Sequence, residues 1–217
     1  MVSPKEMPTA KQAGVSSSIY LTHSLAHIEL NAVELAWDTL MMAAHEKLPE
    51  EFFKDFISIA ADEARHFDLL CDHLKSQGSQ YGAIPAHDNL WNIAIKTKDD
   101  ILARVAMIQL VQEPRALDSH DRLRKKFIGA QDKKAVQLID VICYEEIEHV
   151  RIGMKWYEYL CRRAHKEPIP TFHALATQLA VVIPPPFNVQ SRQQAGMPPE
   201  WYLPIAKTHK AHPKSSH

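Results

Sequence analysis

The chain has 217 residues, of which 46% are hydrophobic and only 6 are glycine, a composition that suits one well-buried helical domain. Its formal net charge of -1 argues against an electrostatic binder of nucleic acid or of a membrane surface. Three cysteines without close pairing, no apolar signal segment and no apolar run long enough to cross a bilayer predict a soluble, cytoplasmic protein.

The first half of the chain predicts two helices joined by a short turn. Residues 1–15 are rich in proline and polar side chains, and we expect them to form a flexible N-terminus. Serines at 16–18 offer N-caps for a helix that reaches about Lys47, and the turn at Leu48-Pro49 leads to a second helix over about 51–76. The apolar stripe of this second helix also carries Glu63 and His66, so both should point inward.

A long connection over 78–97 separates these helices from two more. Asp99-Asp100 suit the start of a third helix, and Pro114 directly after Glu113 predicts a kink or bulge at that acid. Gly129 marks a turn before a fourth helix over about 132–164.

The residues after Glu167 change in composition. Their prolines leave room for one short helix near 171–182, followed by an extended wrap whose aromatic residues would pack on the helices. We therefore expect four regions, namely a flexible 1–15, a helical bundle over 16–167, a packed segment over 168–205 and a disordered tail over 206–217.

A repeated motif connects this organisation to chemistry. Asp62-Glu63-Ala64-Arg65-His66 and Glu145-Glu146-Ile147-Glu148-His149 align residue for residue, 83 positions apart. Residues three apart share a helix face, so each Glu-x-x-His presents a carboxylate beside an imidazole. A four-helix bundle that holds two metal ions combines two such motifs with one Glu from each of the two other helices. The pattern predicts an all-α four-helix bundle with six metal ligands: Glu34, Glu63, His66, Glu113, Glu146 and His149.

The ligand on the first helix has a rival. Glu34 precedes Glu63 by 29 residues and Glu113 precedes Glu146 by 33, whereas Glu29 precedes Glu63 by 34. Glu29 and Glu34 face about 140° apart on a helix, so only one of them can be a ligand. We favour Glu34, because it lies about as far before the turn as Glu63 lies after it; Glu29 would then form a surface or interhelical ion pair.

The ligand types indicate the metal and the roles. Glu63 and Glu146 would bridge the two ions, and mixed carboxylate and imidazole ligation suits iron or manganese. Asp62 and Glu145 could each accept the second N–H of the histidine on the opposite hairpin, which would fix its tautomer. The alternative is that both are exposed helix charges.

With these residues identified, the chain resembles the ferritin-like di-iron carboxylate superfamily, and more narrowly the family catalogued as domain of unknown function 455. The resemblance spans about residues 20–202 and rests on these phrases: His27-Ile28-Glu29, Ala32-Val33-Glu34-Leu35, Asp62 to Phe67, Tyr81-Gly82, Pro85 to Trp91, Leu117-Asp118, and Glu145 to Val150 with Gly153. Pro114 is a departure from an ordinary ligand helix.

The resemblance implies two iron ions, or manganese or a mixed pair, that react with O2. The favoured function is an O2-dependent oxidase or oxygenase for a small organic substrate, with an electron donor and a monomer or small homo-oligomer as the working form. The alternative is a ferroxidase, an iron-handling protein or a peroxide-detoxifying protein without an organic substrate. A nucleic-acid hydroxylase, prompted by the basic runs at 122–126 and 162–163, is the least favoured. Residues considered near the metals or a substrate are Trp37, His87, Cys143, Tyr144 and Arg192; the sequence assigns none of them a catalytic role.

Overall fold

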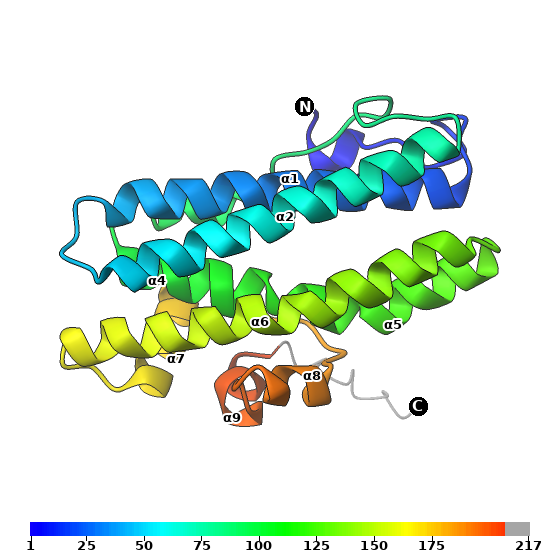
Figure 1. Cartoon of the computed structure of the whole chain (residues 1–217). Coiled ribbons are helices and arrows are strands. Elements are labelled where there is room, and N and C mark those ends of the chain that lie inside the picture. The colour runs from blue at the N-terminus through cyan, green and yellow to red at the C-terminus, as the bar shows by residue number, and fades with distance from the viewer. Residues whose placement is uncertain (207–217) are drawn as a thin grey trace, which may run out of the picture.

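The computed structural model describes residues 1–206, and these form an all-helical protein. The first two long helices, α1 (Ser17–Ala43) and α2 (Glu50–Ser76), run antiparallel as a hairpin (Figure 1). The side chain of Ser16 accepts the Ile19 N–H and caps α1, as its position before the helix predicts. The hairpin turn begins after Ala43 rather than near Lys47, which changes the level at which residues of α1 face α2.

The second hairpin has an interrupted first arm. It consists of α4 (Ile101–Met107), a π-helical segment η2 (Ile108–Gln112) and α5 (Pro114–Gly129), and its second arm is α6 (Lys133–Arg163). The bulge predicted from Pro114 is confirmed, because η2 ends directly before Glu113 and Pro114 begins α5.

One glycine allows the interrupted arm to approach α6 closely. A Cβ placed on Gly153 would lie 2.4 Å from the Cβ of Gln109, which belongs to η2. Any larger residue at position 153 would push η2 away from α6. The close contact fixes the position of η2 along α6. It therefore also fixes the position of Glu113 relative to the Glu-x-x-His motif of α6.

The two hairpins face each other (Figure 1). Their apolar sides are buried between them. Aromatic and aliphatic side chains form the interior at the turn end of the first hairpin, including Phe52, Phe56, Leu110, Val150 and Tyr157. A smaller cluster around Ala26, Leu70, Leu74, Leu138 and Ile142 fills the opposite end. The polar cluster described below lies between these two apolar regions.

The connection between the hairpins folds back over the outer side of α1. It contains the short helix α3 (Trp91–Lys96), and two histidines of α1 hold its first part. His23 Nε2 accepts the Gly82 N–H at 2.9 Å, and His27 Nε2 lies 2.8 Å from the carbonyl oxygen of His87. The N-terminal segment, which contains η1 (Pro4–Glu6), joins this layer through a 2.9 Å bond from the Val2 N–H to the Ala86 carbonyl.

The C-terminal segment is more helical than its prolines suggest. It forms α7 (Pro168–Gln178), α8 (Val189–Gln194), α9 (Pro199–Tyr202) and η3 (Leu203–Ile205), on the side of α4–α6 that faces away from the first hairpin (Figure 1). The prediction of one short helix and an extended wrap was therefore wrong in part, because prolines at the first turn of α7 and α9 start helices rather than prevent them. The predicted disordered tail falls, apart from residue 206, outside the described residues.

A buried ion pair fixes this segment to the second hairpin. Arg192 is fully buried, and its guanidinium donates to both carboxylate oxygens of Asp118, at 2.9 and 2.6 Å. Asn188 caps α8 and also donates its backbone N–H to Asp118 at 2.9 Å.

Over residues 1–206, no helix has both the length and the apolar character that a bilayer span requires.

Candidate metal centre

The repeated motif meets itself in the centre of the molecule. Glu63 and His66 of α2 and Glu146 and His149 of α6 are all at most 2% exposed. Their inward orientation follows from the apolar stripes of the two helices, which place both Glu-x-x-His pairs on buried faces. The imidazole rings of His66 and His149 lie 6.0 Å apart between their centroids.

Two further acids divide this cluster into two overlapping groups. Glu29, Glu63, His66 and Glu146 each offer a ligand atom within 4.8 Å of the others, and so do Glu63, Glu113, Glu146 and His149. Glu63 and Glu146 belong to both groups. Glu29 comes from α1, and Glu113 comes from the point where η2 meets α5, so each of the four long arms supplies at least one group.

The structure corrects the expected ligand of the first helix. Glu34 is exposed on α1, and its neighbours on the same face, Trp37 and Met41, are 51% and 66% exposed. Glu29 is 6% exposed and its Oε2 lies 3.8 Å from His66 Nδ1. The error came from the expected end of the helix at Lys47, which is 13 residues beyond Glu34.

The observed helix ends explain why Glu29 is level with Glu63. Glu29 lies 14 residues before the end of α1 at Ala43, and Glu63 lies 13 residues after the start of α2 at Glu50. At 1.5 Å per residue these are rises of about 21 and about 20 Å from the turn. The 34-residue spacing, which matches the second hairpin better, was the signal in the sequence that favoured Glu29.

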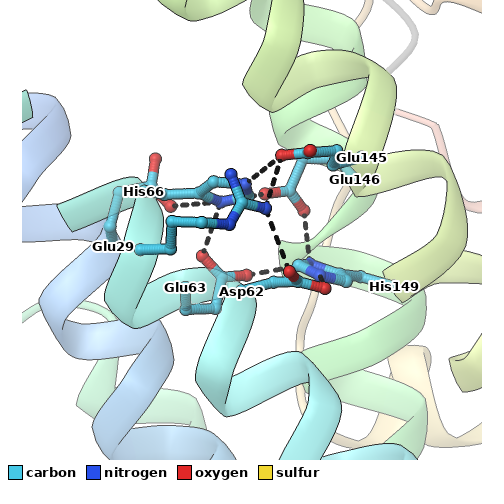
Figure 2. A network of polar contacts seen from close by, with 8 residues as sticks. Glu29, Asp62, Glu63, His66, Glu145, Glu146 and His149 are labelled. Atoms are coloured by element: carbon cyan, nitrogen blue, oxygen red, sulfur yellow. Dashed lines mark hydrogen bonds and ion pairs between the residues drawn. The ribbon is translucent and has the colours of Figure 1, made fainter. Parts of the chain in front are cut away.

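Each histidine points one ring nitrogen at the cluster and the other at an acid of the opposite hairpin (Figure 2). His66 Nδ1 lies 3.4 Å from Glu63 and 3.6 Å from Glu146, while its Nε2 lies 2.7 Å from Glu145 Oε2. His149 Nδ1 lies 3.0 Å from Glu63 and 3.2 Å from Glu146. Its Nε2 faces Asp62 Oδ2 at 3.5 Å, which is longer than a good hydrogen bond.

Arg65 connects the two outer acids, a role that the sequence did not reveal. Its guanidinium donates to Asp62 Oδ1 at 3.0 Å and to Glu145 Oε2 at 2.9 Å, and the second bond joins α2 to α6. These charge-assisted bonds hold both carboxylates beside the histidines, and they lower the pKa of Glu145 although burial alone would raise it. The corresponding residue of the second motif is Glu148, so the repeat gave no sign of this contact.

The inner carboxylates are electrostatically unfavourable by themselves. Burial raises the pKa of Glu29 and Glu113 well above the usual range, and the charges of Glu63 and Glu146 raise it further. Burial also opposes ionisation of Glu63, but the imidazoles of His149 and His66 close beside it outweigh burial and keep the pKa of this carboxyl well below its usual value. Negative charge is therefore favoured on the Glu63 carboxylate, which lies between the two histidines.

The donor atoms fit two cations. Within residues 1–206, both oxygens of Glu63 and Nδ1 of His66 are buried without a hydrogen-bond partner, although buried polar atoms are normally paired. Four carboxylates would balance the charge of two divalent ions, and carboxylate with imidazole is the ligand set of iron and manganese. Convergent, unpaired donor atoms in an apolar interior are what such ions require.

The other residues considered for the site separate into three groups. Trp37 and Tyr144 are 51% and 77% exposed and lie outside the cluster, which corrects their expected position near it. Arg192 is buried in the ion pair with Asp118 and is structural. Cys143 is 8% exposed beside Glu146, and burial, followed by the Glu146 charge, raises the pKa of its thiol to about 12, so it stays protonated at neutral pH.

A cavity of about 390 Å³ leads from the surface to the cluster, and it lies between α1, α5 and α6. Glu29, Glu113 and Glu146 lie among its lining residues, and most of the remaining lining side chains are apolar. Leu90 of the connection between the hairpins also lines it. In the described part of the chain, no residue of α7, α8 or α9 is among its lining residues.

The fold and the site define an all-helical protein with a buried cluster of carboxylates and imidazoles between two helical hairpins. The chain belongs to the family described as "Protein of unknown function (DUF455)", which it matches over residues 1–203. It is also similar to an "Uncharacterized protein" of Haemophilus influenzae strain Rd. The two are 34% identical over an alignment 223 residues long, which covers 99% of this chain and 77% of the relative. No solved structure matches the chain.

Proposed function

We propose that this protein is a ferritin-like four-helix bundle that binds two iron ions and acts as an O2-dependent oxidase or oxygenase on a small organic substrate. The observation that carries the proposal is the pair of overlapping donor groups that share Glu63 and Glu146. Shared carboxylates between two sites are the arrangement of a dinuclear centre, since a single ion would need only one of the groups.

Each of the two donor groups would hold one ion. Glu29 and His66 would bind one, Glu113 and His149 the other, and Glu63 and Glu146 would bridge them. Nδ1 would be the ligating atom of both histidines, because it faces the carboxylates while Nε2 faces an outer acid. When bound, the two ions supply the redox chemistry with O2; manganese or a mixed pair would fit the same donors.

The side chains around the centre orient it and shield it from water. Glu145 accepts from His66 Nε2 and holds that ring with Nδ1 directed inward, and Arg65 fixes Glu145 in turn. On the side that a substrate would enter, the walls of the cavity are mostly apolar, so a bound substrate would displace water from the centre. This cavity favours an organic substrate over iron storage, because a path for hydrated Fe(II) would be lined by polar groups.

The overall reaction would insert one oxygen atom into a substrate C–H bond. R–H, O2, two electrons and two protons give R–OH and water, so O2 is the oxidant and an external one-electron donor of the flavin or iron–sulfur class supplies the reducing equivalents. In an oxidase reaction the substrate itself would supply the electrons, and no donor would be needed.

Metal analysis of the purified protein tests the proposal. We expect about two iron or manganese ions per chain in the wild type, and loss of both in Glu63→Ala and in Glu146→Ala, because each residue contributes to both groups. Glu148→Ala is the matched control, since Glu148 lies in the same motif but is exposed and pairs with Arg151. Retention of two ions in either bridging variant would refute the assignment.

Exposure to O2 separates the reaction classes. Protein loaded anaerobically with Fe(II) and then mixed with O2 should give a transient optical absorption without forming a ferric mineral. Rapid mineral formation with many ions per chain would instead support iron storage and would contradict an oxidase or oxygenase.

A further inference from the structure

The buried end and the surface end of the cavity at the metal centre carry charged side chains of opposite sign. Its floor carries Glu29, Glu113 and Glu146, whereas Arg115 and Arg122 of α5 lie among its lining residues and are exposed at the surface. We propose that the cavity binds an apolar molecule with one anionic group, of the kind of a medium-chain carboxylic acid, with the anion at Arg115 and Arg122 and the apolar end toward the floor. The assignment of this molecule as the substrate rests on the proposed function; its binding does not.

The walls are suited to a hydrocarbon chain. The cavity is lined by Leu25 and Ile28 of α1, Leu123 of α5, and Ile139 and Ile142 of α6. Its volume of about 390 Å³ lies in the range of small-molecule sites, which are mostly apolar with a few polar groups that orient the ligand. Burying a chain here would remove apolar surface of both partners from water, at about 25 cal/mol per Å².

The two arginines at the mouth differ from every other arginine of the chain. Within residues 1–206, the other seven arginines each lie within 4.0 Å of an acidic side chain: Arg65, Arg104, Arg124, Arg151, Arg162, Arg163 and Arg192. In the same part of the chain neither Arg115 nor Arg122 has such a partner, and Arg122 bonds only to the hydroxyl of Ser119 at 3.3 Å. Two guanidinium groups that lack acids beside an apolar cavity can bind a carboxylate through charge-assisted hydrogen bonds.

The charges at the two ends set the orientation of the ligand. An anion at the floor would meet three carboxylates, which repel it, and the four carboxylates of the cluster already balance the charge of two divalent ions. At the mouth it would meet two positive charges. The ligand would therefore enter with its apolar end first, and the carbon atoms nearest the metal centre would be those far from the anionic group.

A second hollow beside the mouth gives the anionic group a polar surrounding. This hollow, of about 420 Å³, shares Ser24, Ile28, Leu90, Gln112 and Arg115 with the cavity. Its remaining lining is more polar and includes His87, Asn89 and Asn92 from the connection between the hairpins. Arg115 lies at the junction, where a bound carboxylate could keep contact with water and with amide donors.

Calorimetric titration of the full-length protein, with its metal bound, tests the proposal with three probes that share a ten-carbon chain. Sodium decanoate, used below its micellar concentration, should bind at least about tenfold more tightly than decan-1-ol or decyltrimethylammonium, because only decanoate presents an anion to the arginines. Equal affinity for decanoate and decyltrimethylammonium would overturn the proposal, since an unselective apolar cavity would give that result.

Variants locate the binding. Replacing both arginines, as Arg115→Gln with Arg122→Gln, should weaken decanoate binding about tenfold or more and leave decan-1-ol within about twofold. Lys125→Gln with Lys126→Gln is the matched control, because it removes the same charge from the same helix outside the cavity and should leave decanoate binding unchanged. Ala116→Phe should block both ligands by filling the cavity, with circular dichroism to verify the fold. Undiminished decanoate binding in the double arginine variant or in a folded Ala116→Phe protein would refute the assignment.

Metal content of the same samples separates this proposal from the previous one. Selective decanoate binding by protein that holds fewer than two ions would support the ligand class and contradict the dinuclear centre. Two ions per chain without selective decanoate binding would contradict the ligand class alone.

Discussion

The paired substitutions Glu29→Gln and Glu34→Gln test which acid of α1 belongs to the metal centre. The residues lie on one helix, five positions apart, and the two variants make the same chemical change. Glu29 is buried, with its Oε2 3.8 Å from His66 Nδ1, whereas Glu34 is exposed. The structure therefore predicts different results from two variants that the sequence pattern alone barely separates.

Glu29→Gln should affect stability in opposite directions with and without bound metal. With metal, Glu29→Gln removes a charged ligand and should weaken binding by at least about 10- to 100-fold, which is about 1.4 to 2.7 kcal/mol of metal-linked stability. Without metal, the same variant removes a carboxylate whose ionisation is opposed by burial and by the charge of Glu63, so the free energy of unfolding should stay equal or rise by about 1 kcal/mol. Glu34→Gln should change stability by less than about 0.5 kcal/mol in either state.

Urea unfolding of both variants, with and without Mn(II) as a redox-stable probe, gives these quantities directly. Metal per chain is measured on the same samples after removal of free ion. A loss of metal in Glu34→Gln together with full binding in Glu29→Gln would refute the register that places Glu29 level with Glu63.

Three further predictions concern stability. Gly153→Ala should destabilise the protein by about 1 to 3 kcal/mol in thermal unfolding, because its Cβ would overlap Gln109, and an unchanged melting temperature would show that η2 adjusts freely. Asp118→Ala should cost about 3 to 5 kcal/mol because it leaves Arg192 buried and unpaired; if Asp118→Ala and Arg192→Met with Asp118→Ala unfold alike, the unpaired charge is not the cause. Burial opposes ionisation of Asp132, but hydrogen bonds from Ser18, the Ala135 N–H and His73 outweigh it and lower the pKa of Asp132 from 3.8 to about 2. This carboxylate therefore stabilises the fold above pH 3.8 and loses that effect as the pH falls toward 2. Between pH 4 and 2, the Asp132→Asn variant should therefore lose about 2 kcal/mol less unfolding free energy than the wild type. Urea titration at each pH measures this difference, and an unchanged pH dependence would contradict the prediction.

The arrangement of the acid and histidine residues was largely readable from the sequence. Helical period alone places Glu63, His66, Glu146 and His149 on buried faces, because the apolar residues around them repeat with the same period. The position of Glu145 directly before Glu146 also pointed it toward the histidine of the opposite hairpin. These are local properties, since a helix fixes the direction of a side chain relative to neighbours three and four residues away.

Other features depended on contacts between distant parts of the chain. The choice of Glu29 over Glu34 followed from where α1 ends, and a helix end shifted by four residues moves the facing position by a full turn. The contact of Arg65 with Glu145 joins residues 80 apart, and the lack of acid partners for Arg115 and Arg122 appears only when all side chains are placed.

The sequence by itself thus determined the helices of the two hairpins, their inner faces and the two motifs on those faces, because these follow from periodicity along one segment. Only the tertiary structure decided the level at which the hairpins meet, the cavity beside the cluster and the charges at its mouth. Those depend on the lengths of turns and on packing between segments, which no local pattern encodes.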